Sequence, residues 1–128
     1  MPPLQSILVV AAGSAVGGAL RAILVSLTAR HVTAGFPLGV LLVNVVGSFV
    51  FGIAMRMGLQ GAMSDQTRLL ITTGLCGGFT TFSAFSMDIV EGLEQGRTTM
   101  VTTYATLSIV LGVGAMLAGL ALGRTLSR

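Results

Sequence analysis

The sequence predicts an all-α membrane protein of four transmembrane helices, with a break in the third helix. Of its 128 residues, 53% are hydrophobic and only 9% are charged, whereas a soluble domain has about 25% charged residues. The mean hydropathy is +0.94, and most of the apolar residues lie in long runs that contain no charge. The chain has the length of one domain, so we treat residues 1–128 as a single transmembrane domain.

The charge-free runs set the number of spans, and they cover residues 1–20, 32–55, 69–87 and 98–123. Each run is close to the ~20 residues that a helix needs to cross the hydrocarbon core. Helices are expected because every backbone N–H and C=O in lipid needs a partner within its own segment. We place the unbroken helices at roughly 5–29, 37–58 and 98–123. The first run is expected to stay in the protein, because a signal peptide starts with a basic region and the first basic residue here is Arg21.

The charges argue against nucleic-acid binding and bear on topology. The net charge is +3, but the basic residues are scattered singly and form no patch. With four spans, the two chain ends and the middle loop share one side of the membrane and carry four of the seven arginines. The other side carries two, or three if Arg21 is counted. Arginines in short loops set orientation, and this weak bias allows either a single orientation or insertion in both, which would permit an antiparallel dimer.

The third span differs from the others in composition. Residues 72–86 read TTGLCGGFTTFSAFS, with six hydroxyl side chains and three glycines. Gly77 and Gly78 are poor helix formers, because each glycine costs about 0.8–1 kcal/mol relative to alanine. We therefore predict that the helix breaks at Gly77–Thr80. Broken membrane helices expose carbonyls and half-helix ends that bind ions. A glycine-rich packing notch without a ligand is the alternative.

Residues for enzymatic catalysis are sparse, so we expect a protein that is not an enzyme and has no organic cofactor. The single histidine, His31, has no acidic residue near it in the sequence, and the spans show no paired carboxylates and no nucleophile–base set. Asp88, Glu91 and Glu94 lie three residues apart, which is typical of a solvated helix end. Cys76 can form no intrachain disulfide, and we assign it no role.

Four side chains within the spans could act on an ion. An ionisable group such as Arg21 is costly in a membrane span and suggests a function. Arg21 could face an aqueous vestibule or contact another helix. Alternatively, its side chain could extend to the lipid headgroups. The Asn44 carboxamide carries two N–H donors, which could form a hydrogen bond to a neighbouring helix or bind an anion. Phe82 and Phe85 share one helical face, where they pack or turn their electropositive ring edges toward a small anion.

The segment from Gly77 to Ser86, GGFTTFSAFS, closely resembles the GGxTTFSTFS signature of the fluoride channels called Fluc or CrcB. Further motifs agree in order and spacing along the whole chain, namely Gly13, Gly17, Gly18 and Arg21 in the first span, Gly39 to Asn44 in the second, and Tyr104 and Ser108 in the fourth. The resemblance implies passive, fluoride-selective export through two pores of an antiparallel, dual-topology homodimer. It also implies a multi-pass protein of a prokaryotic inner (plasma) membrane.

The resemblance further implies roles for individual residues. Asn44 would donate hydrogen bonds to fluoride, and Phe82 and Phe85 would present their ring edges to it. The other implied pore residues are Arg21, Ser83, Tyr104 and Ser108. The backbone carbonyls of Gly77 and Thr80 would hold a structural sodium ion at the dimer interface. The implied partners are thus fluoride, sodium, the lipid bilayer and a second copy of the chain, and no nucleic acid.

Two positions depart from the family pattern, and two other classes of protein compete with a channel. Val40 and Ala84 stand where the family often has threonine. This chain therefore lacks two hydroxyl groups that could help to pass the ion, and it would conduct more slowly or by a slightly different route if they do. A small four-helix multidrug or proton-coupled exporter has a similar length and dual topology, but it needs a carboxylate within the bilayer, for which Asp88 is the only candidate. A non-conducting membrane assembly subunit would leave the polar break unexplained.

Overall fold

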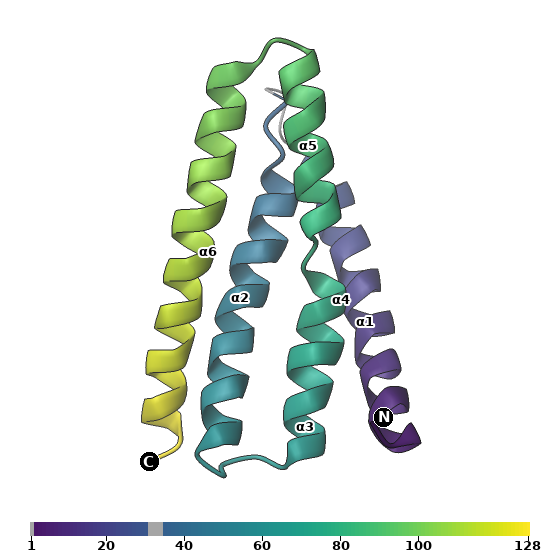
Figure 1. The fold of residues 1–128 in the computed structure, drawn as a ribbon, viewed down its shortest axis with the longest axis vertical. Helices are drawn as coiled ribbons and strands as arrows, with labels where there is room; N and C mark the ends of the chain where they lie inside the picture. Colours follow the sequence, from purple (N-terminus) through teal and green to yellow (C-terminus); the bar gives the residue numbers. More distant parts are fainter. Residues whose placement is uncertain (1, 31–34) are drawn as a thin grey trace.

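A computed structural model describes residues 2–30 and 35–128, and His31 lies outside them. Within the described residues, four helical stretches are long and apolar enough to cross a membrane (Figure 1). Three of these stretches are single helices, namely α1 (Leu4–Ala29), α2 (Leu38–Leu59) and α6 (Thr98–Leu126). The fourth consists of α3 (Asp65–Leu69), the π-helical segment η1 (Leu70–Cys76), α4 (Gly77–Phe79) and α5 (Phe82–Glu94). The predicted all-α membrane fold is confirmed.

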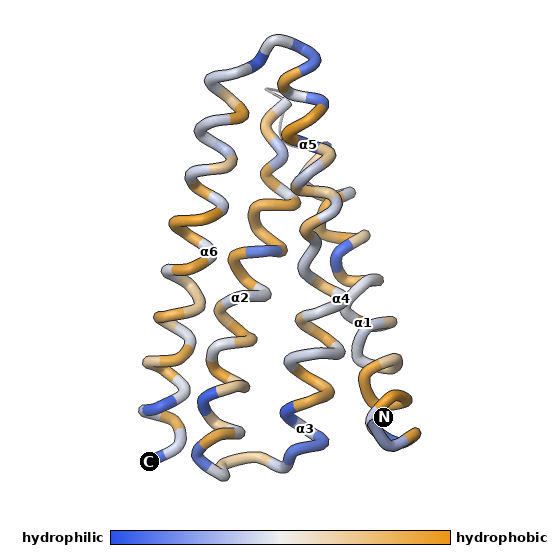
Figure 2. Tube along the Cα trace, in the orientation of Figure 1, coloured by the Kyte–Doolittle hydropathy of each residue, from blue (hydrophilic) through white to orange (hydrophobic). Residues whose placement is uncertain are grey.

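The helices form two closely packed groups that lie side by side. The most extensive contacts join α2 to α6 and α1 to η1 and α4. Both chain ends and the turn between α2 and α3 lie at one end of the molecule, and the turn between α5 and α6 lies at the other (Figure 1). Figure 2 shows apolar residues along the helices and hydrophilic residues at the turns, as expected for segments that cross lipid.

Local sequence signals account for several helix ends. Pro3 and Pro37 directly precede α1 and α2, where a residue without an N–H leaves no donor unpaired. The Ser64 side chain caps α3 by accepting a hydrogen bond from the Thr67 amide at 3.1 Å. Gly96 has a φ of +69° in the turn between α5 and α6, a conformation that residues with a Cβ rarely adopt.

The predicted break at Gly77–Thr80 is confirmed, and it lies at the C-terminal edge of that range, at Thr80 and Thr81. Both threonines have extended backbones, with φ/ψ of −83°/157° and −151°/119°. Gly77 and Gly78 are helical. A Cβ on Gly78 would lie 2.8 Å from Cα of Ser14, so this glycine allows α1 to approach closely. The π-helical turn that precedes the glycines was not predicted.

Gly13 and Gly17 of α1 form a GxxxG motif that packs against the third helix, as small residues at this spacing often do in membrane proteins. A Cβ on Gly13 would lie 2.6 Å from the Leu70 carbonyl oxygen, and one on Gly17 would lie 2.8 Å from the Phe79 amide nitrogen and would also overlap the Leu75 carbonyl. Backbone atoms cannot move aside as the end of a flexible side chain can. The contact between α1 and the third helix therefore depends on these glycines.

We expect Gly17→Ala to lower the stability of the folded protein by roughly 1–3 kcal/mol, the usual effect of overpacking. The added methyl group would push α1 away from η1 and α4. The measurement is the melting temperature of the purified protein in detergent. Gly18→Ala is the matched control, because a Cβ there would meet only the Gly78 carbonyl oxygen, at 4.0 Å. Equal melting temperatures for the two variants would contradict the close contact at Gly17.

Candidate functional site

A groove of about 580 Å³ opens beside the break, between α2, α6 and the third helix. Its walls are mainly apolar, with hydroxyl groups and one carboxamide, and none of the described lining residues carries a charge. Six lining residues are ones to which the sequence analysis gave roles: Asn44, Gly77, Thr80, Phe82, Phe85 and Ser108. The fold thus brings together residues from three helices that are far apart in the sequence.

Asn44 pairs with both backbone polar groups of Thr81. Its Nδ2 donates to the Thr81 carbonyl at 3.1 Å, and its Oδ1 accepts from the Thr81 amide at 2.8 Å. The interhelical hydrogen bond that the sequence analysis considered for Asn44 is therefore present. A carboxamide has two N–H donors, and the pair with Thr81 uses one of them. Asn44 thus holds the break in place from the wall of the groove.

The break diverts two amides from their usual helical acceptors. In a continuous helix the Thr81 amide would bond to the Gly77 carbonyl and the Ala84 amide to the Thr80 carbonyl. Here the Thr81 amide donates to Asn44, and the Ala84 amide donates at 3.1 Å to the Thr81 hydroxyl, which caps α5. The carbonyls of Gly77 and Thr80 therefore lack the helical donors that would otherwise bind them. These are the two carbonyls that the resemblance assigned to a cation.

Arg21 contacts one of these two carbonyls. It lies within α1, it is partly buried, and its Nη1 donates to the Thr80 oxygen at 3.1 Å. Of the alternatives that the sequence left open for Arg21, the structure shows the helix contact. Arg21 is not among the described residues that line the groove. The guanidinium group takes the place of the helical N–H that the Thr80 carbonyl has lost.

Phe82 and Phe85 begin a row of aromatic rings at the first turn of α5. Their ring centroids are 5.8 Å apart with the planes tilted by 41°, and Phe85 lies 5.3 Å from the ring of Tyr104. Phe36 meets Tyr104 edge-on at 5.7 Å. Phe82 is 79% exposed in the single chain. Phe82 is therefore the member of the row that is open to lipid, to a ligand or to another chain.

Tyr104 is fully buried, and its hydroxyl donates to Oδ2 of Asp88 at 2.8 Å. Glu91 and Glu94 are exposed, as expected for a solvated helix end, whereas Asp88 is partly buried and accepts this bond. Tyr104 is not among the described groove residues, since Phe85 lies between its ring and the groove. The sequence offers no periodic signal for the pair, because Asp88 and Tyr104 lie on different helices.

Two hydroxyl groups complete the set of assigned residues. The Ser108 oxygen is buried on the groove wall and has no hydrogen-bond partner within the described structure. Ser83 is exposed, and its hydroxyl lies 3.3 Å from that of Thr81, so it belongs to the cap of α5 and not to the described groove lining. Among the described residues, no three His, Cys, Asp or Glu side chains lie together as metal ligands.

Comparison with known proteins agrees with the resemblance found in the sequence. The family model described as "CrcB-like protein, Camphor Resistance (CrcB)" matches residues 8–120. A "Fluoride-specific ion channel FluC" of Granulibacter bethesdensis is 42% identical over 127 residues, which cover 98% of this chain and 99% of the relative. The FluC of Agrobacterium fabrum is 40% identical over 122 residues, covering 94% and 98%, and that of Thermus thermophilus is 39% identical over 123 residues, covering 96% and 98%.

These relatives are ion channels of bacteria, so the expectation that the chain is not an enzyme is confirmed. The four apolar helices agree with a multi-pass membrane protein. Both the family model and the relatives cover nearly the whole chain, including the break and the groove residues. The chain therefore belongs to the CrcB-like family, the family of the FluC channels.

Proposed function

We propose that this chain forms a channel that passes fluoride selectively and passively across the membrane. The observation that carries the proposal is the uncharged groove at the helix break, in which Asn44, Phe82 and Phe85 come together. The names of relatives about 40% identical over nearly the whole chain support fluoride as the ion. The proposed transport is not coupled to protons or to another ion, because fluoride passes through a channel down its own concentration gradient.

The groove has the chemistry that a small, strongly hydrated anion needs. Fluoride gives up hydrogen bonds to water when it enters a pore, so the walls must supply donors in their place. Asn44 has one N–H that the pair with Thr81 does not use, and the buried Ser108 hydroxyl has no partner among the described residues. The rings of Phe82 and Phe85 add electropositive edges. A conducting site must bind its ion weakly enough to release it, and the absence of charge on the described lining suits this requirement.

We further propose that two antiparallel copies assemble, with one pore for each copy. A groove lined by hydroxyl groups is unfavourable against lipid, which cannot hydrogen-bond to it, and Phe82 is 79% exposed beside it. A second copy would cover both. The groove is lined by residues of α2, the third helix and α6, and in this proposal the partner would supply the remaining wall of each pore.

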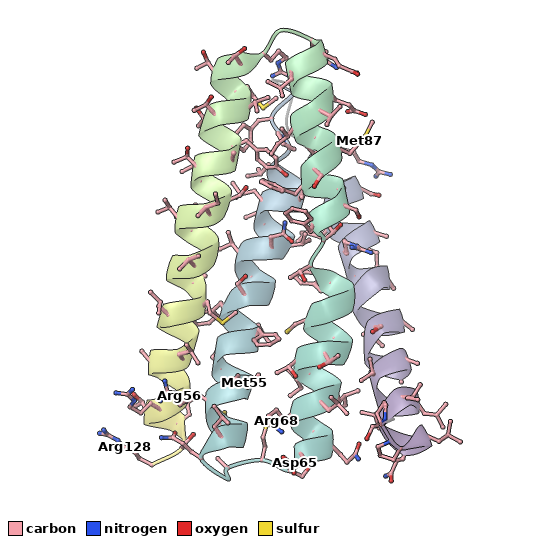
Figure 3. The ribbon with its side chains drawn as sticks, viewed as in Figure 1. Met55, Arg56, Asp65, Arg68, Met87 and Arg128 are labelled. Carbon is pink, nitrogen blue, oxygen red and sulfur yellow. The ribbon has the colours of Figure 1, made fainter. Side chains whose placement is uncertain are left out.

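The charges at the two ends of the molecule favour an antiparallel arrangement. One end carries Arg56, Arg68, Arg128 and Asp65 (Figure 3), together with Arg124 in the last turn of α6. The other end carries two arginines and three acidic residues: Arg30, Arg97, Asp88, Glu91 and Glu94. Antiparallel packing places the basic end of one copy beside the acidic end of the other, whereas parallel packing places like charges together. The weak arginine bias between the two sides allows insertion in both orientations.

The helix break fits a structural sodium ion between the two copies. The carbonyls of Gly77 and Thr80 have lost their helical donors, and carbonyl oxygen is a ligand that hard cations prefer. Gly77 is exposed on the groove, where it could face a second copy. The Thr80 oxygen already accepts from Arg21, but a carbonyl has two lone pairs. When bound, such an ion would stabilise the carbonyls that lack helical donors at the break.

Fluoride efflux from proteoliposomes tests the channel directly. We expect purified protein to release trapped fluoride down its gradient, with chloride retained under the same conditions. A proton ionophore that abolishes any pH gradient should leave the efflux unchanged. Efflux that stops in the presence of the ionophore would instead support a proton-coupled exporter, for which the partly buried Asp88 carboxylate would be the candidate coupling group.

The roles of the groove residues are tested by two substitutions. Asn44→Asp replaces the N–H donors with a carboxylate, and we expect efflux to fall by roughly a hundredfold or more, as when a key anion donor is removed. Phe82→Ile keeps an apolar side chain but removes the ring edge, and we expect a fall of roughly tenfold, equivalent to about 1.4 kcal/mol of barrier. The readout is efflux rate for protein that elutes as the same oligomer as the wild type.

Two matched controls accompany these variants. Gln60→Glu makes the same amide-to-acid change at the exposed C-cap of α2, and Phe49→Ile makes the same ring change on α2 outside the described groove lining. Both should transport fluoride at nearly the wild-type rate. Wild-type rates in Asn44→Asp and Phe82→Ile would place the pore elsewhere.

The antiparallel dimer predicts that the C-terminus lies on both faces of the membrane in similar amounts. A single cysteine added after Arg128, in a chain whose Cys76 is replaced by alanine, can be labelled with a membrane-impermeant reagent in intact cells. About half of the chains should react before lysis and the remainder after it. Labelling that is complete or absent in intact cells would contradict the dual topology.

A further inference from the structure

The hydrogen bond between Arg21 and the break places a fixed positive charge at a site proposed for a cation. Arg21 lies in the interior of α1, and its Nη1 is 3.1 Å from the Thr80 oxygen. An arginine within a membrane span is costly, and a neutral donor such as serine or asparagine could satisfy the carbonyl without this cost. The charge itself therefore calls for an explanation.

We propose that Arg21 is a specificity-determining residue that restricts the carbonyl site at the break to monovalent cations. This inference rests on the sodium site proposed above. A cation bound to the same oxygen would lie within roughly 6 Å of Nη1, if its distance to oxygen is near the 2.3–2.6 Å of a calcium ion. At that separation the guanidinium repels every cation, and it repels a divalent ion twice as strongly as a monovalent one.

The size of this repulsion is enough to decide which ion binds. With an effective dielectric constant of about 20, one unit charge at roughly 6 Å weakens the binding of a monovalent cation by roughly tenfold to a hundredfold. The corresponding factor for a divalent cation is the square of this value. Calcium and sodium ions are similar in size and both prefer oxygen ligands, so size and ligand type do not separate them. The charge of Arg21 does, because it disfavours calcium more strongly than sodium.

A purely structural role for Arg21 is the competing explanation. In that case the guanidinium only supplies the N–H that the Thr80 carbonyl lost when the Ala84 amide bonded to the Thr81 hydroxyl. Loss of Arg21 would then destabilise the break to the same extent in every salt. The two roles differ in one measurable quantity, which is the dependence of stability on the charge of the cation.

The experiment measures the melting temperature of the purified dimer against increasing NaCl or CaCl₂, with ionic strength kept constant by an N-methylglucamine salt. Arg21→Gln and Arg21→Met are the neutral variants, and either one suffices if the other does not assemble. Arg21→Lys keeps the charge. Arg30→Gln, at the exposed C-cap of the same helix, removes an arginine outside the site and serves as the control.

We expect sodium but not calcium to stabilise the wild type, the lysine variant and the Arg30→Gln control. In the neutral variants the sodium midpoint should fall by tenfold or more, and calcium should now stabilise the protein as well. Wild-type protein that calcium stabilises as well as sodium would overturn the inference. So would unchanged midpoints in the neutral variants, or a lysine variant that behaves like them.

The same experiment separates this inference from the proposals on which it rests. If neither cation stabilises the wild type or the neutral variants, both the sodium site and the role of Arg21 are wrong. The fluoride channel is judged separately, by the efflux of the wild-type protein. If sodium stabilises the wild type and the neutral variants show the same midpoints, the sodium site stands and only the role of Arg21 fails.

Discussion

The two hydrogen bonds between the Asn44 carboxamide and the Thr81 backbone allow a helix to open in the middle of a membrane-spanning segment. An unpaired backbone group in lipid costs several kilocalories per mole, and a helix that opens at two consecutive residues exposes several such groups at once. One side chain of α2 satisfies both groups of Thr81. The first turn of α5 and the orientation of Phe82 and Phe85 depend on this pair, because α5 begins directly after Thr81, and both Asn44 and Thr81 line the groove.

The glycines of α1 support the break from the opposite side. Gly13 and Gly17 bring the backbone of α1 against η1 and α4, and this approach allows the guanidinium of Arg21 to reach the Thr80 carbonyl. The break is thus held by a carboxamide from α2 and a guanidinium from α1. The glycine packing and the polar contacts depend on each other, because the Arg21 side chain can contact Thr80 only when α1 lies close to the third helix.

Much of the fold could be predicted from the sequence, because the length and spacing of charge-free runs follow directly from the thickness of a bilayer. The break was predicted at Gly77–Thr80 and lies at the C-terminal edge of that range: Gly77 and Gly78 lower helix propensity but stay helical, Gly78 serves the packing of α1, and the chain opens at Thr80, where side chains of other helices replace the lost bonds. Asn44 and Arg21 were identified as unusual residues, yet their partners depend on tertiary contacts. The Tyr104–Asp88 bond joins neighbouring helices across a turn, and nothing in the periodicity of either helix indicates it.

The order of the helices along the chain has a consequence for how this protein enters the membrane. Synthesis proceeds from the N-terminus, and N-terminal parts fold first. Arg21 and Asn44 belong to the first two spans, and both of their acceptors, Thr80 and Thr81, belong to the third. The donors are therefore already in the bilayer when the third helix arrives. The broken third helix, whose open backbone groups are unfavourable in lipid, is synthesised only after Arg21 and Asn44, the two residues whose side chains bind those groups.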